Sequence, residues 1–151
     1  MKTVRQLLQL KGNHVCSVSP DTTVYSALKI MADNNVGALL VLEQSELVGI
    51  FSERDYARKV ALRGKSSKDT HVREIMTEKV DCVSPAQSVN ECMGLMTRKH
   101  IRHLPVMENN QLAGVISIGD VVKAVISEHE FTIEQLESYI TGIPTTRGVS
   151  A

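Results

Sequence analysis

Residues 18–55 read VSPDTTVYSALKIMADNNVGALLVLEQSELVGIFSERD, and residues 83–120 read VSPAQSVNECMGLMTRKHIRHLPVMENNQLAGVISIGD. The two stretches align without a gap at the 65-residue offset that separates Pro20 from Pro85. Both begin with Val-Ser-Pro, and both end on a Gly, a Ser and an Asp at the same spacing. A match of this length and order indicates an internal repeat, so the fold is built from two similar units.

Each repeat changes its hydrophobic period twice. Apolar residues first follow the i, i+3, i+4, i+7 spacing of an amphipathic helix, at Val24, Ala27, Leu28 and Met31 and again at Val89, Cys92, Met93 and Met96. Two short aliphatic runs follow, at 38–42 and 47–51 and again at 104–107 and 112–116, with polar connections of hairpin length between them. A closing helix is predicted from Glu53 to about Arg63 and from Ile118 to about Glu128. With a short strand at the start, each repeat has the order strand, helix, strand, strand, helix.

A unit of about fifty residues leaves one face of its sheet uncovered. We therefore predict an α+β fold in which two βαββα repeats pack sheet to sheet about a pseudo-two-fold axis. Related lead-in segments, 3–8 and 71–76, precede the repeats. The predicted division is 1–68 for the first repeat with its lead-in and spacer, 69–129 for the second repeat, 130–142 for a C-terminal helix with a capping box at 132–135, and 143–151 for a disordered tail.

The composition argues against several classes of function. Lys plus Arg and Asp plus Glu number 17 each, so no net charge draws the chain to nucleic acid or to anionic lipid. Aromatic residues make up 3% and Trp is absent, which removes the usual platforms for base stacking. The chain shows neither an apolar stretch of membrane-spanning length nor the pattern of a signal peptide, and its three cysteines lack CxxC spacing. These features predict a cytoplasmic protein without a membrane or nucleic-acid partner.

The junction of the last strand and the closing helix carries the same polar pattern in both repeats. Gly49, Ser52 and Asp55 recur as Gly114, Ser117 and Asp120. Ser-x-x-Asp has the spacing of a helix capping box, which is the usual meaning of such a motif. The same geometry also suits a ribose phosphate, because a helix N-terminus offers N–H groups and a carboxylate can accept two hydrogen bonds from a vicinal diol. Both interpretations remain open from the residues alone.

The whole pattern, with the His103-Leu104-Pro105-Val106 run of the second repeat, resembles the tandem CBS-domain module, named after cystathionine beta-synthase. The resemblance covers roughly residues 3–128. It implies adenosine-containing ligands such as AMP, ATP, NAD or S-adenosylmethionine in two clefts between the sheets, and a disc-shaped homodimer. By that similarity Asp55 and Asp120 hold ribose hydroxyls, while Ser52 and Ser117 lie near ribose or phosphate. The first repeat departs from the family pattern, since it has Leu40 where the second has Pro105.

The two repeats differ most in charge. Arg54 corresponds to Gly119, whereas the basic segment 98–103 of the second repeat replaces a neutral or acidic one. A pseudo-two-fold axis would bring this basic segment towards the Ser-x-x-Asp motif of the first repeat, so the clefts are expected to be unequal. Gly37 and Ala38 are small enough either for a flat base or for close sheet packing. The predicted nucleotide site consists of Gly37, Ala38, Ser52, Arg54, Asp55, His100, Arg102, His103, Pro105, Ser117, Ile118 and Asp120, with no catalytic residue and no metal ligand.

Two classes of function follow. The first is a regulatory adenine-nucleotide sensor that requires no cofactor, is not an enzyme, and signals through conformation or dimer geometry to a separate partner protein. The second is a ligand-independent homodimerisation or protein-interaction module in which the Ser-x-x-Asp motifs only cap helices. A metal site at His14, Cys16 and Cys82, and a nucleophilic Cys82–His103 pair, lack the further residues that such chemistry needs. A homodimer is expected in both classes, because aliphatic helix faces are left exposed.

Overall fold

The computed structural model describes residues 2–141. The first part of the chain forms α1 (Val4–Lys11), β1 (Ser17–Val18), α2 (Val24–Asn34), β2 (Ala38–Glu43), β3 (Glu46–Ser52), α3 (Glu53–Tyr56) and η1 (Ala57–Ala61), a π-helical continuation of α3. The second part forms α4 (Val72–Ile75), α5 (Val89–Lys99), β4 (His103–Glu108), β5 (Gln111–Ser117) and α6 (Ile118–Thr141). The predicted α+β class is confirmed, and the order helix, strand, strand, helix recurs in both repeats.

The first long helix of each repeat begins and ends at equivalent residues. The side chains of Thr23 and Ser88 accept hydrogen bonds from the backbone N–H groups of Ser26 and Glu91, and so cap α2 and α5. Both helices stop at a residue in the left-handed region, Asn35 with φ 53° and His100 with φ 54°. The shared caps give the two repeats the same helix length and the same path into the following strand.

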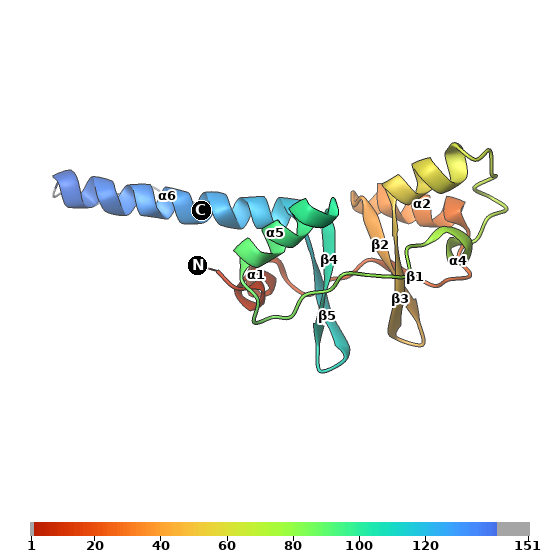
Figure 1. Ribbon diagram of the computed structural model, residues 1–151, viewed down its shortest axis with the longest axis horizontal. Coiled ribbons are helices and arrows are strands. Elements are labelled where there is room, and N and C mark those ends of the chain that lie inside the picture. The colour runs from red at the N-terminus through yellow and green to blue at the C-terminus, as the bar shows by residue number, and fades with distance from the viewer. Residues whose placement is uncertain (1, 142–151) are drawn as a thin grey trace.

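Each repeat contains an antiparallel hairpin, β2–β3 or β4–β5, with the same register. The turns at residues 44–45 and 109–110 have positive φ at both positions, as a type I′ turn requires. Figure 1 shows the two hairpins side by side. Strands β3 and β5 contact each other, which is the sheet-to-sheet packing expected from the repeat.

The short first strand forms fully in the first repeat alone. There β1 lies parallel to β2, and the N–H of Leu40 donates to the carbonyl of Cys16 over 3.1 Å. In the second repeat the predicted strand is reduced to a single bridge between Val83 and Val106. The cause is Pro105, the counterpart of Leu40, because proline has no N–H to donate to the neighbouring strand.

The two lead-in helices exchange places between the repeats. α1 packs in the core of the second repeat through Val4, Leu7 and Leu8, while α4 packs in the core of the first through Val72 and Ile75. The pseudo-two-fold axis also relates individual backbone hydrogen bonds of the two lead-in helices. The N–H of Val4 donates to Gln87 over 2.9 Å, and the N–H of Val72 donates to Thr22 over 2.8 Å.

The core of each repeat is therefore completed by the lead-in helix of the other repeat. The predicted division at residue 68 separates both lead-in helices from the cores that they complete. Phe51 and Leu39 are fully buried in the first core, and Ile116 and Leu104 in the second. The cavities described below lie between the two repeats.

The C-terminal region corrects a sequence prediction. Two helices were expected, one ending near Glu128 and one beginning at Thr132, but α6 runs without a break from Ile118 to Thr141 and projects beyond the two hairpins (Figure 1). No Gly or Pro occurs between Glu128 and Thr132, and the hydroxyl of Thr132 donates to the carbonyl of Glu128 over 3.0 Å instead of capping a new helix. The tail predicted at 143–151 lies outside the described residues. Within residues 2–141, no helix combines the length and the hydropathy that crossing a bilayer requires.

Candidate functional site

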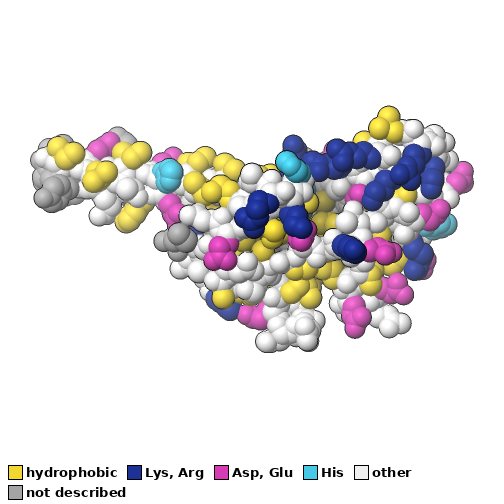
Figure 2. All heavy atoms as spheres, in the orientation of Figure 1, with side chains coloured by type: hydrophobic (Ala, Val, Ile, Leu, Met, Phe, Trp, Pro, Cys, Tyr) yellow, Lys and Arg dark blue, Asp and Glu magenta, His cyan; other side chains and the backbone are white. Residues whose placement is uncertain are grey.

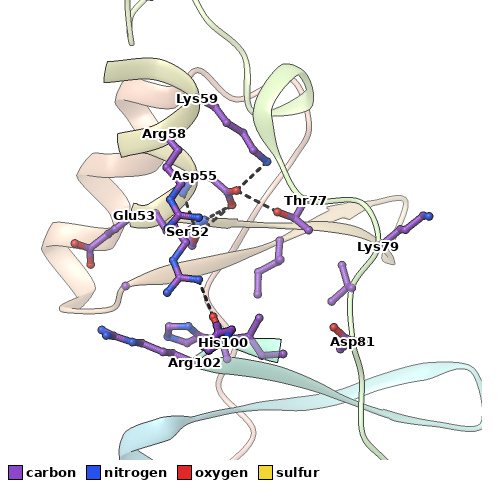
Figure 3. A pocket seen from close by; sticks show the side chains of 16 residues that line it. Ser52, Glu53, Asp55, Arg58, Lys59, Thr77, Lys79, Asp81, His100 and Arg102 are labelled. Atoms are coloured by element: carbon purple, nitrogen blue, oxygen red, sulfur yellow. Dashed lines mark hydrogen bonds and ion pairs between the residues drawn. The ribbon is translucent and has the colours of Figure 1, made fainter. Parts of the chain in front are cut away.

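A cavity of about 570 Å³ lies between the two repeats, and we call it the first cavity. Its size is within the range of ordinary small-molecule sites. It is lined by Gly37, Ile50, Ser52, Glu53, Arg54, Asp55, Arg58, Lys59, Thr77, Lys79, Val80, Asp81, His100, Ile101, Arg102 and His103. Figure 3 shows three sides: Ser52, Asp55 and Arg58 from the first repeat, His100 and Arg102 opposite them, and Thr77, Lys79 and Asp81 on the connecting segment.

Asp55 is the buried acidic group of this cavity, with 7% of its surface exposed. Its Oδ2 atom accepts hydrogen bonds from the N–H and the hydroxyl of Ser52, at 3.0 and 3.1 Å. Its Oδ1 atom accepts from the hydroxyl of Thr77 at 3.1 Å and pairs with Lys59 Nζ at 2.9 Å. The capping box predicted at Ser52 and Asp55 is present. Both carboxylate oxygens are therefore engaged by protein donors.

The second repeat closes the opposite side of the first cavity. Arg54 Nη1 donates to the carbonyl oxygen of His100 over 2.7 Å, which links the two repeats directly. His103 lies beside Gly37, where an added Cβ atom would be 3.7 Å from the imidazole Cε1 and 3.0 Å from Glu53 Oε1. Burial, followed by the positive charge of Lys11, lowers the pKa of His103, so this side chain is neutral at pH 7.

The connecting segment between the repeats forms the third side. The backbone of Thr77 exchanges two hydrogen bonds with Ile50, at 2.9 and 3.0 Å, and this pairing holds the segment against the edge of β3. Thr77, Lys79 and Asp81 were not among the predicted site residues. They lie outside the stretch 83–120 that repeats without a gap, so the comparison of the two repeats did not select them.

The first cavity has a surplus of positive charge. Five Lys and Arg residues line it against three Asp and Glu residues. Within residues 2–141, no hydrogen bond or ion pair engages the side chains of Arg58, Lys79 or Arg102. These cations are free to bind an anion. Figure 2 shows dark blue Lys and Arg groups gathered over the part of the molecule that contains the first repeat.

A second cavity, of about 430 Å³, occupies the pseudo-equivalent position. Asp120 Oδ2 accepts from the N–H of Ser117 at 2.8 Å and from Lys11 Nζ at 2.6 Å, while Lys11 also donates to the carbonyl of Val115 at 2.9 Å. Burial opposes ionisation of Asp120, but the hydrogen bonds from Lys11 and Ser117 outweigh it and lower its pKa. Lys11 and Asp120 neutralise each other, so this cavity has no charge surplus from Lys, Arg, Asp or Glu.

Two CBS-domain matches, at residues 11–62 and 72–127, coincide with the two repeats. The chain belongs to the CBS-domain family. It is 49% identical over 149 residues to CBS domain-containing protein CBSX3, mitochondrial, of Arabidopsis thaliana, an alignment that covers 93% of this chain and 72% of that protein.

Solved structures agree with the tandem CBS fold. A protein with CBS domains from Burkholderia ambifaria superposes with a TM-score of 0.81 at 50% identity, covering 83% of this chain and 95% of that one. The CBS domain pair of protein MJ0100, solved with 5′-methylthioadenosine and S-adenosyl-L-methionine, has a TM-score of 0.74 at 21% identity over 85% of this chain and 98% of that one, a likeness of fold alone. Tandem CBS domains are a regulatory, ligand-binding module.

The CBS domains bring most of the predicted site residues to the two cavities. Gly37, Ser52, Arg54, Asp55, His100, Arg102 and His103 line the first cavity, and Gly37, Ala38, His103, Ser117 and Asp120 line the second. Pro105 and Ile118 line neither: Pro105 is buried in β4, and Ile118 packs on the core of the second CBS domain. Their assignment to the binding surface is not supported by these positions. Lys11 was missed because it lies in α1, ahead of the repeated stretch that begins at Val18, yet contacts Asp120 of the second repeat.

Two further predictions concern metal and location. His14 Nε2 lies 3.7 Å from Cys16 Sγ, but residues 2–141 contain no group of three or more His, Cys, Asp or Glu residues suited to a metal ion. The name of the plant relative assigns that CBS-domain protein to mitochondria, and the cytoplasmic location predicted for this chain stays a prediction.

Proposed function

We propose that the chain is a regulatory module that binds an adenine nucleotide in the first cavity. The observation that carries the proposal is the set of three unpaired cations, Arg58, Lys79 and Arg102, in a cavity that also contains a buried carboxylate. Phosphate groups are recognised by such cations, since a charged donor and acceptor make the strongest hydrogen bonds. AMP, ATP and NAD are the candidate ligands.

The parts of the nucleotide have separate partners in this proposal. Arg58 and Arg102 approach the phosphates from opposite repeats, and Arg54 joins them after exchanging its bond to His100. The ribose diol binds Asp55 by displacing the hydroxyl of Thr77 from Oδ1. We place the flat base beside Gly37, which has no side chain to fill the space next to Glu53 and His103.

The second cavity suits a ligand with less negative charge. Lys11 is already paired with Asp120, so an incoming polyphosphate meets no unpaired Lys or Arg among the described residues that line it. Adenosine, or a sulfur-containing adenosine compound such as the thioether and the sulfonium solved with MJ0100, is the expected class for this cavity. The two cavities then report two different adenosine compounds.

Binding is proposed to regulate and not to catalyse. A nucleotide that contacts both repeats binds best at one relative angle of the two sheets, so it shifts the population towards that angle. The proposed readout is a change in homodimer geometry that a separate partner protein recognises. No reaction is proposed for the bound nucleotide.

A thermal-shift panel tests the proposal with adenosine, AMP, ATP, NAD and S-adenosylmethionine against guanosine, GMP and GTP. At one hundred times the dissociation constant, a ligand of the native state alone stabilises it by about 2.7 kcal/mol, which is a measurable shift. We expect ATP or AMP to raise the melting temperature and the guanine nucleotides to raise it less. If no adenine compound at millimolar concentration changes the melting temperature, the proposal is wrong.

A second candidate is a ligand-independent dimerisation module. The observation in its favour is that both oxygens of Asp55 already accept hydrogen bonds within the protein, so the Ser-x-x-Asp motif has a complete structural role as a cap. The thermal-shift panel separates the two candidates. A dimer that forms without any nucleotide response is the outcome that this second candidate predicts.

A further inference from the structure

Helix α6 carries a row of exposed apolar side chains. Val122, Ile126, Ile133, Leu136 and Ile140 have between 44% and 79% of their surface exposed. α6 contacts α5, α1 and β5, and near its N-terminal end it buries Val121 and Ala124 in the core of the second repeat, on a face adjacent to this row. Figure 2 shows hydrophobic groups along the projecting part of this helix. A helix of this kind gains most of its stability from packing, so an uncovered apolar row indicates a partner.

The spacing of the row is that of a coiled-coil seam. With His129 included, the positions advance by 4, 3, 4, 3 and 4 residues from Val122 to Ile140. Apolar residues at this alternation keep one face of a helix against a neighbouring helix. The seam extends over roughly 27 Å at 1.5 Å per residue, which is most of the length of α6.

The seam is complementary to itself in the antiparallel direction, because the spacing reads the same backwards. A second α6, rotated about a two-fold axis at the level of residue 131, sets Val122 against Ile140 of the second copy. The same rotation sets Ile126 against Leu136 and His129 against Ile133. Each of these residue pairs then contains at least one aliphatic side chain.

The flanking charges favour this direction. Lys123 follows the seam residue Val122, and Glu137 follows the seam residue Leu136. In the antiparallel register, Lys123 of one copy lies beside Glu137 of the other copy. An in-register parallel pairing sets His129 against His129 and gives Lys123 no acidic neighbour of this kind. Glu130 meets its own copy near the axis, a repulsion that the two Lys123–Glu137 pairs oppose.

The sign of the charge also argues against a lipid surface. α6 carries Glu128, Glu130, Glu134 and Glu137 against the cation Lys123, and interfacial helices are instead rich in Lys and Arg. We infer that the α6 seam binds the α6 seam of a second copy of this chain in an antiparallel pair. The inference adds to the proposed homodimer the surface that forms it, and it does not require nucleotide binding.

Sedimentation equilibrium on the full chain, without nucleotide, tests this surface. The wild type is expected to be a dimer, and Ile133→Glu is expected to weaken dimerisation at least about tenfold, because it places a carboxylate in the seam. Gln135→Glu adds the same charge on an exposed position outside the seam and serves as the matched control. Circular dichroism checks that all three proteins remain folded. A monomeric wild type, or equal dimerisation of wild type and Ile133→Glu, overturns the inference.

A charge exchange tests the direction. Lys123→Glu alone is expected to weaken the dimer, because it faces Glu137 of the second copy. The double variant Lys123→Glu with Glu137→Lys is expected to recover wild-type dimerisation. Within one helix these residues are fourteen positions apart, about 21 Å, so recovery cannot come from contact inside the chain. Failure of the double variant to recover contradicts the antiparallel register, and neither result depends on whether a nucleotide binds.

Discussion

Asp55 and Asp120 occupy the same position in the two repeats but have different partners. Asp55 accepts hydrogen bonds on both oxygens, from Ser52 and Thr77, and pairs with Lys59. Asp120 uses Oδ2 for Ser117 and Lys11, and within residues 2–141 no donor to its Oδ1 is found. A repeated motif therefore produces one saturated carboxylate and one with a vacant oxygen.

The difference predicts unequal effects of the same substitution. In Asp55→Asn the amide NH₂ points at a protein donor in either orientation, so the free energy of unfolding should fall by about 2–3 kcal/mol. In Asp120→Asn the amide oxygen can keep the bonds at Oδ2 and the NH₂ can occupy the vacant side, so the loss should stay below about 1 kcal/mol. Urea unfolding of both variants without ligand measures this. Equal losses would show that the partners of Asp55 contribute nothing beyond the cap.

The sequence predicted the motif residues and not their partners. Ser52, Asp55, Ser117 and Asp120 repeat at one offset, so self-comparison finds them. Thr77 has Gln9 at the equivalent position of the first lead-in, and Lys11 has Lys79 at that of the second. The contacts of Thr77 and Lys11 with the two carboxylates join distant parts of the chain. Contacts of that kind follow from the exchange of lead-in helices, which no local pattern records.

At the scale of elements, Gly49 and Gly114 mark where each lead-in crosses the last strand of a repeat. A Cβ atom on Gly49 would lie 2.8 Å from Met76 Sδ and 3.0 Å from the carbonyl oxygen of Thr77. A Cβ atom on Gly114 would lie 2.9 Å from Leu8 Cδ2, the end of a mobile side chain. A side chain at position 49 would therefore meet backbone atoms, whereas a side chain at position 114 would meet only the side chain of Leu8.

We expect Gly49→Ala to destabilise the fold by about 1–3 kcal/mol, because the connecting segment has to move away from β3. Gly114→Ala should be close to neutral, since Leu8 can rotate and alanine in a strand recovers roughly 0.5–1 kcal/mol of backbone entropy. Thermal unfolding of the two variants gives the comparison. A larger loss at Gly114 than at Gly49 would contradict the account of how the segment is held.

Helices were predicted best where a regular apolar stripe marks them. α2 and α5 have the predicted stripe, a capping Thr or Ser and a left-handed last residue, and both were found. α6 was divided wrongly because Thr132 resembles a cap in sequence but bonds backwards within a continuous helix. The first strand of the second repeat was overestimated because the missing N–H of Pro105 matters only once its neighbour is known.

The pseudo-two-fold axis relates the backbones of the two repeats, but the charged side chains that line the two cavities differ. The first cavity collects cations from both repeats and from the connecting segment, while the second contains the neutral Lys11–Asp120 pair. The sequence predicted unequal clefts because residues 98–103 are basic, whereas the corresponding residues of the first repeat are neutral or acidic. The unequal sizes and charges of the two cavities agree with this prediction. We propose that this difference lets the first cavity bind the phosphates of an adenine nucleotide.

Isothermal calorimetry with ATP and with adenosine measures phosphate binding in this cavity for the wild type, Arg58→Ala and the control Arg63→Ala. Arg63 is an exposed cation of the same repeat that does not line the cavity. Loss of one charge-assisted hydrogen bond corresponds to about tenfold or more in affinity, so Arg58→Ala should weaken ATP by that factor and leave adenosine nearly unchanged. Arg63→Ala should match the wild type for both ligands. Equal weakening of ATP and adenosine by Arg58→Ala, or no binding of ATP to the wild type, would show that Arg58 does not bind phosphate in this cavity.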